Sequence, residues 1–139
     1  MTTTFIYRAV QAQQSASHKV LTFAAKAQDI FAFAEIDRVG RDAGGALRGF
    51  QRPQIAAHIR EIRDYLSLKD SVLPNSVVVA FTDRVTLRAI DEDIVEITID
   101  VTRGKPGFVV DGQQRLTALA ALPEKEFELF VSVLICPNY

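Results

Sequence analysis

One short stretch gathers residue types that bind phosphate or hold a reacting water. The stretch Asp111–Arg115 reads Asp-Gly-Gln-Gln-Arg and lies between two apolar runs, Phe108–Val110 and Leu116–Leu119. The first run is typical of a strand and the second of a helix. A helix start exposes unpaired N–H groups and a partial positive charge, which together attract anions. The glycine allows a tight turn and the close approach of a ligand to the backbone.

Each side chain of this stretch could contribute to an anion site. Arg115, one turn into the predicted helix, offers donors in a fork that matches phosphate oxygens. Asp111 can cap the helix, hold a divalent metal such as Mg²⁺, or orient a water. Gln113 and Gln114 add neutral donors and acceptors. The pattern predicts a phosphate pocket without a P-loop, because no GxxxxGK[ST] motif is present. The alternative is an ordinary turn and helix cap.

A second stretch repeats this design about sixty residues upstream. Gly49 is followed by Gln51-Arg52 and then by Pro53, which suits the first position of a helix. Two Gln-Arg pairs at two helix starts could converge on one anion. The alternative is that Arg52 joins a surface ion pair, which contributes little to stability.

The elements that must position these residues follow from hydrophobic periodicity. We expect strands at 3–10, 19–25, 76–81, 94–101 and 127–135, and helices at 27–36, from Pro53 to Leu66, and at 113–122. The turn 102–107 predicts that 94–101 and 108–110 form a hairpin. Irregular alternation of strands and helices predicts an α+β domain, a mixed β-sheet with flanking helices.

A glycine-rich segment, 37–49, holds four of the seven glycines and is the best candidate for a mobile loop. Arg38, Arg41 and Arg48 in this segment could close over a ligand or touch a DNA backbone. The alternative is a surface loop without such a role. His18 and His58 have no second ligand at metal-site spacing, so no chemical role is assigned to either.

Composition limits the classes of protein to which the chain can belong. A length of 139 residues and 48% apolar residues indicate one globular domain, 1–139. The net charge of −1 argues against binding nucleic acid by bulk positive charge. A single cysteine excludes an internal disulfide and a multi-cysteine zinc site. Since no apolar run is long enough to span a membrane and no signal peptide is evident, we expect a cytoplasmic protein without a membrane partner.

The run FVVDGQQRLTAL, with FQRP upstream and LPNSVVVAF between them, resembles the DGQHR-domain family. This family includes the DNA phosphorothioation protein DndB and relatives from other DNA-modification clusters. The resemblance covers about Phe5 to Ile135, and Gln114 stands where the family motif has histidine. DGQQR is also the form in GmrSD-type restriction endonucleases and similar phage-defence nucleotidases. Both groups are similar to the ParB/sulfiredoxin-like superfold, which the resemblance implies for this chain.

The resemblance implies that Asp111–Arg115 line a nucleoside-triphosphate or nucleic-acid phosphate site, which Gln51 and Arg52 face. It implies a nucleotide-binding domain of a bacterial DNA-modification or phage-defence system, with nucleotide, DNA or other DNA-modification proteins as partners. If the domain is a Mg²⁺-dependent NTPase, Asp111 would hold Mg²⁺ or water and Arg115 would neutralise charge, because the amide of Gln114 cannot transfer a proton near neutral pH.

Two alternatives to this function remain open. The first is a non-catalytic DNA-binding transcriptional regulator, and the second is a structural partner domain whose motif only caps a helix. Family chains are commonly longer, so this chain is expected to form the N-terminal or core part of a larger architecture. A homo-oligomer is compatible with the resemblance.

Overall fold

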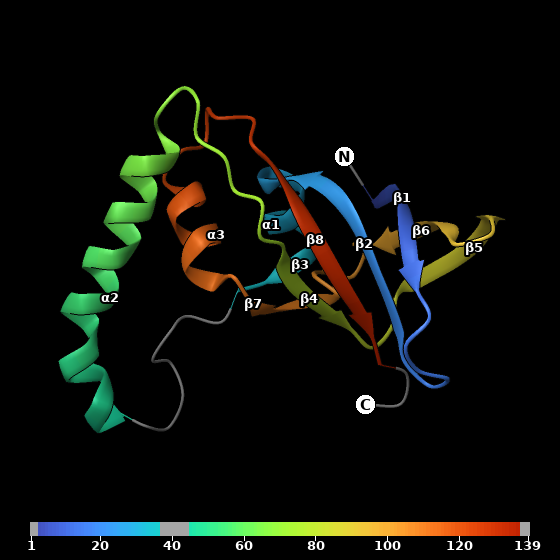
Figure 1. The fold of residues 1–139 in the computed structure, drawn as a ribbon. Coiled ribbons are helices and arrows are strands. Elements are labelled where there is room, and N and C mark those ends of the chain that lie inside the picture. Colours follow the sequence, from blue (N-terminus) through green and yellow to red (C-terminus); the bar gives the residue numbers. More distant parts are fainter. Residues whose placement is uncertain (1–2, 37–44, 137–139) are drawn as a thin grey trace.

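The computed structural model describes residues 3–36 and 45–136, and it describes only the backbone of 45–54. The described residues form an α+β domain, which confirms the predicted fold class (Figure 1). The strands are β1 (Thr4–Ala12), β2 (Lys19–Lys26), β3 (Ala34–Glu35), β4 (Val77–Phe81), β5 (Val85–Asp91), β6 (Ile94–Asp100), β7 (Gly107–Asp111) and β8 (Glu128–Ile135). The helices are α1 (Ala27–Phe33), α2 (Gly45–Leu66) and α3 (Gln113–Ala120).

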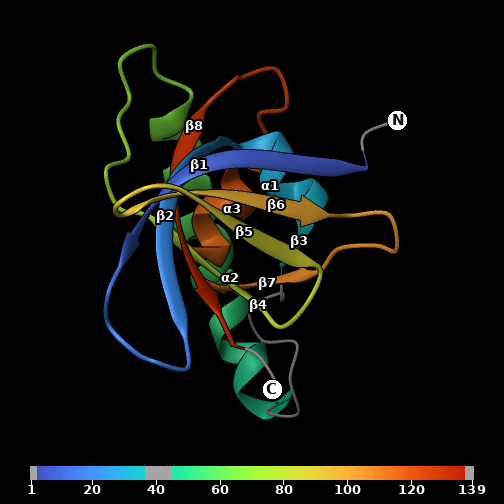
Figure 2. The same ribbon diagram turned by 90° about the vertical axis from the view of Figure 1, so that its right-hand side faces the viewer.

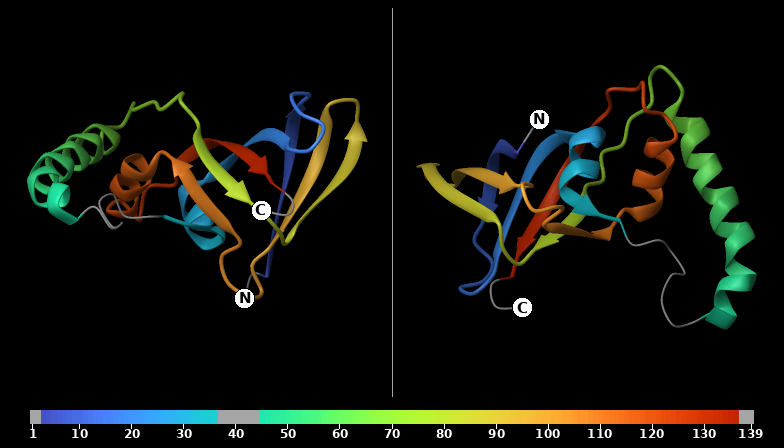
Figure 3. Two further views of the ribbon diagram at one scale, coloured as in Figure 1. Left: turned by 90° about the horizontal axis from the view of Figure 1, so that it is seen from below. Right: turned by 180° about the vertical axis from the view of Figure 1, so that it is seen from behind.

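The strands form one mixed sheet in the order β3-β7-β4-β8-β2-β1-β6-β5. The pairs β3–β7 and β4–β8 are parallel, and the other neighbouring pairs are antiparallel. Figures 2 and 3 show that the sheet is strongly twisted and curled. Strand β7 leads into the Asp111–Arg115 stretch, and β4 lies beside β7. This order places both strands at the end of the sheet opposite the β5–β6 hairpin.

The core lies on the inner face of the curled sheet, where α1 packs. Phe33 of α1 is fully buried, and its ring contacts Phe5, Tyr7, Phe23 and Phe81 from three strands, β1, β2 and β4. The Tyr7 hydroxyl donates to Asp29 Oδ2 at 3.1 Å and so ties β1 to α1. Burial first, and the Asp29 charge second, raise the pKa of Tyr7 above its usual value.

Helices α2 and α3 lie side by side at one end of the sheet (Figure 1). Leu66 of α2 and Leu116 and Leu119 of α3 are essentially fully buried. The Lys125 ammonium donates to the carbonyls of Leu66 and Leu68 and to Ser71 Oγ. A cation at the C-terminus of a helix satisfies free carbonyls and the negative end of the helix dipole. Lys125 therefore fixes the end of α2 beside α3.

The structure corrects the predicted hairpin of 94–101 with 108–110. Both edges of β6 are occupied, by β1 and by β5, whereas β7 pairs with β4 and β3. Strand β5 was not predicted, and it forms the true hairpin with β6 across the exposed Asp91-Glu92-Asp93 turn. The 102–107 segment instead carries the chain across to the other end of the sheet.

The structure also corrects the start of the long helix. Helix α2 begins at Gly45, so residues 45–49 are helical rather than part of a loop, and Pro53 lies about two turns inside the helix. Gln51-Arg52 therefore does not precede a helix start. Residues 37–44, which include Arg38 and Arg41, lie outside the described residues. The predicted strands at 3–10, 19–25, 76–81, 94–101 and 127–135 and the helix at 113–122 are confirmed with small shifts of their ends. The helix predicted at 27–36 ends at Phe33, and Ala34–Glu35 form strand β3 instead.

Candidate functional site at the start of helix α3

Gly112 forms the bend between β7 and α3 in a conformation that only glycine adopts readily. Its φ is +99°, in the left-handed region, and it occupies the N-cap position of α3. A Cβ added there would lie 2.5 Å from Cγ1 of Val77, which is fully buried. The bend therefore packs directly on β4, and the glycine is required by both backbone conformation and space.

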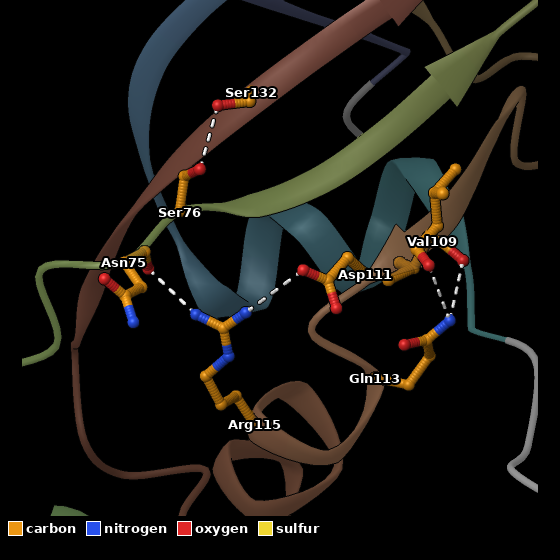
Figure 4. Close-up of polar contacts among 8 residues, drawn as sticks. Asn75, Ser76, Val109, Asp111, Gln113, Arg115 and Ser132 are labelled. Carbon is orange, nitrogen blue, oxygen red and sulfur yellow. Dashed lines mark hydrogen bonds and ion pairs between the residues drawn. The ribbon is translucent and has the colours of Figure 1, made fainter.

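The first turn of α3 is open at its N-terminus. Its first intrahelical hydrogen bond runs from Leu116 N to Gly112 O at 3.0 Å. Within the described part of the chain, no side chain caps the helix. Asp111 was one candidate for that cap, but its side chain is 73% exposed and points toward Arg115 instead (Figure 4). The amide groups and dipole of this helix start are thus available to an anion.

The Arg115 side chain lies against the bend and is only 19% exposed. Its Nη1 donates to the Asn75 carbonyl at 3.0 Å, and its Nη2 lies 3.9 Å from Asp111 Oδ2 (Figure 4). The same Nη2 is 3.3 Å from the position that a Cβ on Gly112 would take. A guanidinium has five N–H donors, so one hydrogen bond and one long ion pair leave donors for a ligand. These contacts orient the group toward the start of α3.

The loop that carries Asn75 is itself anchored. Ser76 Oγ and Ser132 Oγ of β8 lie 2.8 Å apart in a hydrogen bond, which is drawn in Figure 4. Because Asn75 is the preceding residue, this bond fixes the carbonyl that positions Arg115.

The side chain of Gln113 makes hydrogen bonds that the sequence does not suggest. Its Nε2 donates to the carbonyls of Val109 at 3.3 Å and Val110 at 3.1 Å (Figure 4). A carbonyl oxygen can only accept, so this orientation of the amide is fixed by the two bonds. The atom left free is Oε1, an acceptor. Gln113 thus braces the strand–helix junction and, in this rotamer, offers no donor to a phosphate.

A cleft of about 550 Å³ opens beside this junction. One wall is the stretch Asp111–Arg115, which includes Gln114. The opposite wall consists of one face of α2 and a residue of the following loop: His58, Glu61, Ile62, Tyr65 and Leu73. Clefts of roughly 300–1,000 Å³ are the usual size for small-molecule sites. The structure therefore brings the predicted motif together with a wall that the motif alone does not reveal.

Three other predicted residues lie earlier in α2 than the residues that line the cleft. Gln51, Arg52 and Arg48 lie in α2 by their backbone, N-terminal to the wall, and their side chains are outside the described residues. The contacts expected of them and of the loop arginines are therefore not tested.

Sequence analysis did not single out Glu61 or Tyr65, and it considered His58 only as a metal ligand. With Ile62, these residues share one face of α2, because positions separated by three, four and seven residues align on a helix. This spacing is the signal that could have found them.

Charge in the cleft is mixed. Glu61 and Asp111 contribute two carboxylates, and Arg115 contributes one guanidinium. No group of three or more potential metal ligands occurs among residues 3–36 and 45–136 with described side chains.

Comparison with known proteins gives one match. The family model described as "DndB: DNA-sulfur modification-associated" matches residues 7–136. No curated protein and no solved structure matches significantly. Separately, no helix in the described part of the chain is both long and apolar enough to cross a membrane.

Proposed function

The chain belongs to the DndB family, whose members are associated with DNA sulfur modification, and we propose that the cleft beside α3 binds a nucleotide through its phosphates. The single observation that carries the proposal is the position of Arg115. Its guanidinium is held beside an uncapped helix start and borders an open cleft. A helix N-terminus and a guanidinium aimed at one point form a favourable place for phosphate oxygens. Gly112 allows the bend that brings the helix start and the guanidinium together, because its missing Cβ leaves room for Val77 and Arg115.

A magnesium ion fits this proposal as a companion of the nucleotide. The two carboxylates of the cleft outnumber its one guanidinium, so a polyphosphate would add negative charge to a site without excess positive charge. Mg²⁺ is commonly bound through one or two carboxylates together with substrate phosphates. The exposed Asp111 carboxylate would supply such a ligand, and the ion would neutralise charge on the phosphates.

Hydrolysis is a further step of the same proposal. Asp111 would orient the attacking water or hold Mg²⁺, and Arg115 would stabilise charge that develops on the phosphates. Gln114, also in the cleft wall, would contribute hydrogen bonds but no proton transfer near neutral pH. Gln51 and Arg52 would approach from α2. The proposal also includes that Asp111–Arg115 act as the motif of the DGQHR-domain family and that the domain is related to the ParB/sulfiredoxin-like superfold.

Isothermal calorimetry with Mg²⁺ and ATP tests the proposal. Removing the guanidinium in Arg115→Ala should weaken binding by roughly 10- to 150-fold, since hydrogen bonds to charged groups contribute about 1.5–3 kcal/mol. Arg88→Ala is the matched control, because Arg88 lies on β5 at the other end of the sheet, paired with Glu96 at 3.1 Å. Absence of binding by the unaltered protein, or equal binding by Arg115→Ala, would disprove the proposal.

The family description favours one alternative, a non-catalytic DNA-binding regulator. In that case Arg38, Arg41 and Arg48 would contact backbone phosphates. Affinity for DNA should fall steeply with salt, and each arginine removed should reduce the slope of log affinity against log salt by about one. A gel-shift series with Arg41→Ala and Arg48→Ala measures this, and a salt-independent or absent shift would reject the alternative.

A further inference from the structure

Tyr65 is held in the cleft by its hydroxyl group rather than by burial of its ring. The hydroxyl donates to the Val72 carbonyl at 3.1 Å and accepts from the Val72 amide at 3.0 Å. Both hydrogen-bonding functions of the hydroxyl are therefore used by the backbone of one residue. The side chain is nevertheless among the exposed large apolar groups, with 43% of Tyr65 accessible. The ring is thus fixed in orientation while remaining accessible.

The neighbours of this ring make an apolar end to the cleft. Ile62 lies one turn earlier on the same face of α2, and Leu73 follows Val72 in the loop. All three line the same cleft as Arg115. The cleft therefore has an aromatic and aliphatic end as well as the charged end at the start of α3.

The two ends are linked by a short, defined path. Tyr65 is bonded to Val72, and Arg115 is bonded to the carbonyl of Asn75. Three residues of fully extended chain span at most about 11 Å, so the anchor points of ring and guanidinium cannot be farther apart than that. The cleft volume of about 550 Å³ is sufficient for a ligand that reaches both. A single nucleotide has the matching design, with a planar base at one end and phosphates at the other.

From these contacts we propose that Tyr65, with Ile62 and Leu73, forms a base-stacking platform, so that the cleft takes a nucleoside triphosphate rather than any polyphosphate. The inference rests on the proposed phosphate site and adds the residues that would hold the base of the nucleotide. A fixed aromatic ring gains from stacking without losing rotamer freedom on binding. Stacking of one base on an aromatic side chain contributes enough to favour a nucleotide over a bare polyphosphate by roughly 5- to 150-fold.

The test compares Mg²⁺–ATP with Mg²⁺–tripolyphosphate by calorimetry. The unaltered protein should prefer ATP by that factor. Tyr65→Leu should make the two affinities similar by weakening the binding of ATP alone, because tripolyphosphate would contact only the charged end of the cleft. Tyr65→Phe retains the ring but loses both hydrogen bonds to Val72 that fix it, so it should keep only part of the preference. Melting curves of both variants establish that they are folded.

The outcomes separate this inference from the phosphate site. Equal binding of ATP and tripolyphosphate by the unaltered protein would overturn the platform and leave the phosphate site standing. A preference for ATP that survives in Tyr65→Leu would also overturn it, because the base would then lie elsewhere. No binding of either ligand would overturn both proposals.

Discussion

Replacing Gly112 by alanine tests whether the bend before α3 is as constrained as the structure indicates. Two costs are expected. A residue with a Cβ in the left-handed region costs about 1–2 kcal/mol, and forcing a methyl group into a packed interior costs about 1–3 kcal/mol. The second cost arises because the new Cβ would lie 2.5 Å from Val77 Cγ1 and 2.9 Å from Val77 Cβ. Gly112→Ala should therefore lower the free energy of unfolding by roughly 2–5 kcal/mol.

Gly104 provides a matched control. It also has a positive φ, +108°, but nothing lies within 4 Å of the position of its Cβ. Gly104→Ala should therefore show the backbone cost alone. Urea unfolding of the two variants isolates the steric part as their difference, about 1–3 kcal/mol. If Gly112→Ala lost no more stability than Gly104→Ala, the close packing of the bend on Val77 would be refuted.

Two further predictions concern the elements that hold the site in place. Lys125→Met should lower the melting temperature by removing charge-assisted hydrogen bonds to the carbonyls of Leu66 and Leu68, which contribute about 1.5–3 kcal/mol, whereas Lys105→Met at an exposed position should not. Tyr7 has a folded-state pKa above its unfolded value, so its contribution to stability is complete below about pH 10 and is lost as pH rises beyond that. Denaturant titrations between pH 9 and 11 should show that the free energy of unfolding falls more steeply with pH for the unaltered protein than for Tyr7→Phe. Parallel curves would contradict the raised pKa of Tyr7.

Much of the fold was predictable because several of its strands alternate clearly between buried and exposed residues. In β6, Val95, Ile97 and Ile99 are buried and their neighbours are partly exposed, so period-two alternation identified the strand. Strand β5 escaped detection because it is an exposed edge strand whose register shifts between Ala89 and Asp91. Without β5, the edge of β6 appeared free, and the wrong hairpin followed.

The start of α2 was mispredicted for a different reason. Proline fits the first turn of a helix, but it also occurs in the interior at the cost of one hydrogen bond. Ala46, Leu47 and Arg48 are all strong helix formers, so local sequence permitted a helix before Pro53. The glycines nearby were given more weight than these residues.

The candidate site, like the fold, was predicted only in part. The local motif fixed the bend, the helix start and Arg115, because these depend on residues adjacent in sequence. The wall of His58, Glu61 and Tyr65 depends on how α2 packs beside α3, which the motif does not encode. The brace formed by Gln113 depends on the position of two carbonyls of β7. Residues that act through tertiary neighbours were therefore the ones that sequence reasoning missed or misassigned.

The central claim is that the start of α3 receives phosphate, and amide chemical shifts measure it most directly. In ¹H–¹⁵N spectra recorded during titration with Mg²⁺–ATP, the amides of Gln113, Gln114 and Arg115 should move most. The amides of the β5–β6 hairpin, at the opposite end of the sheet, should remain in place. Shifts that spare 113–115, or that cluster on another surface, would contradict the claim.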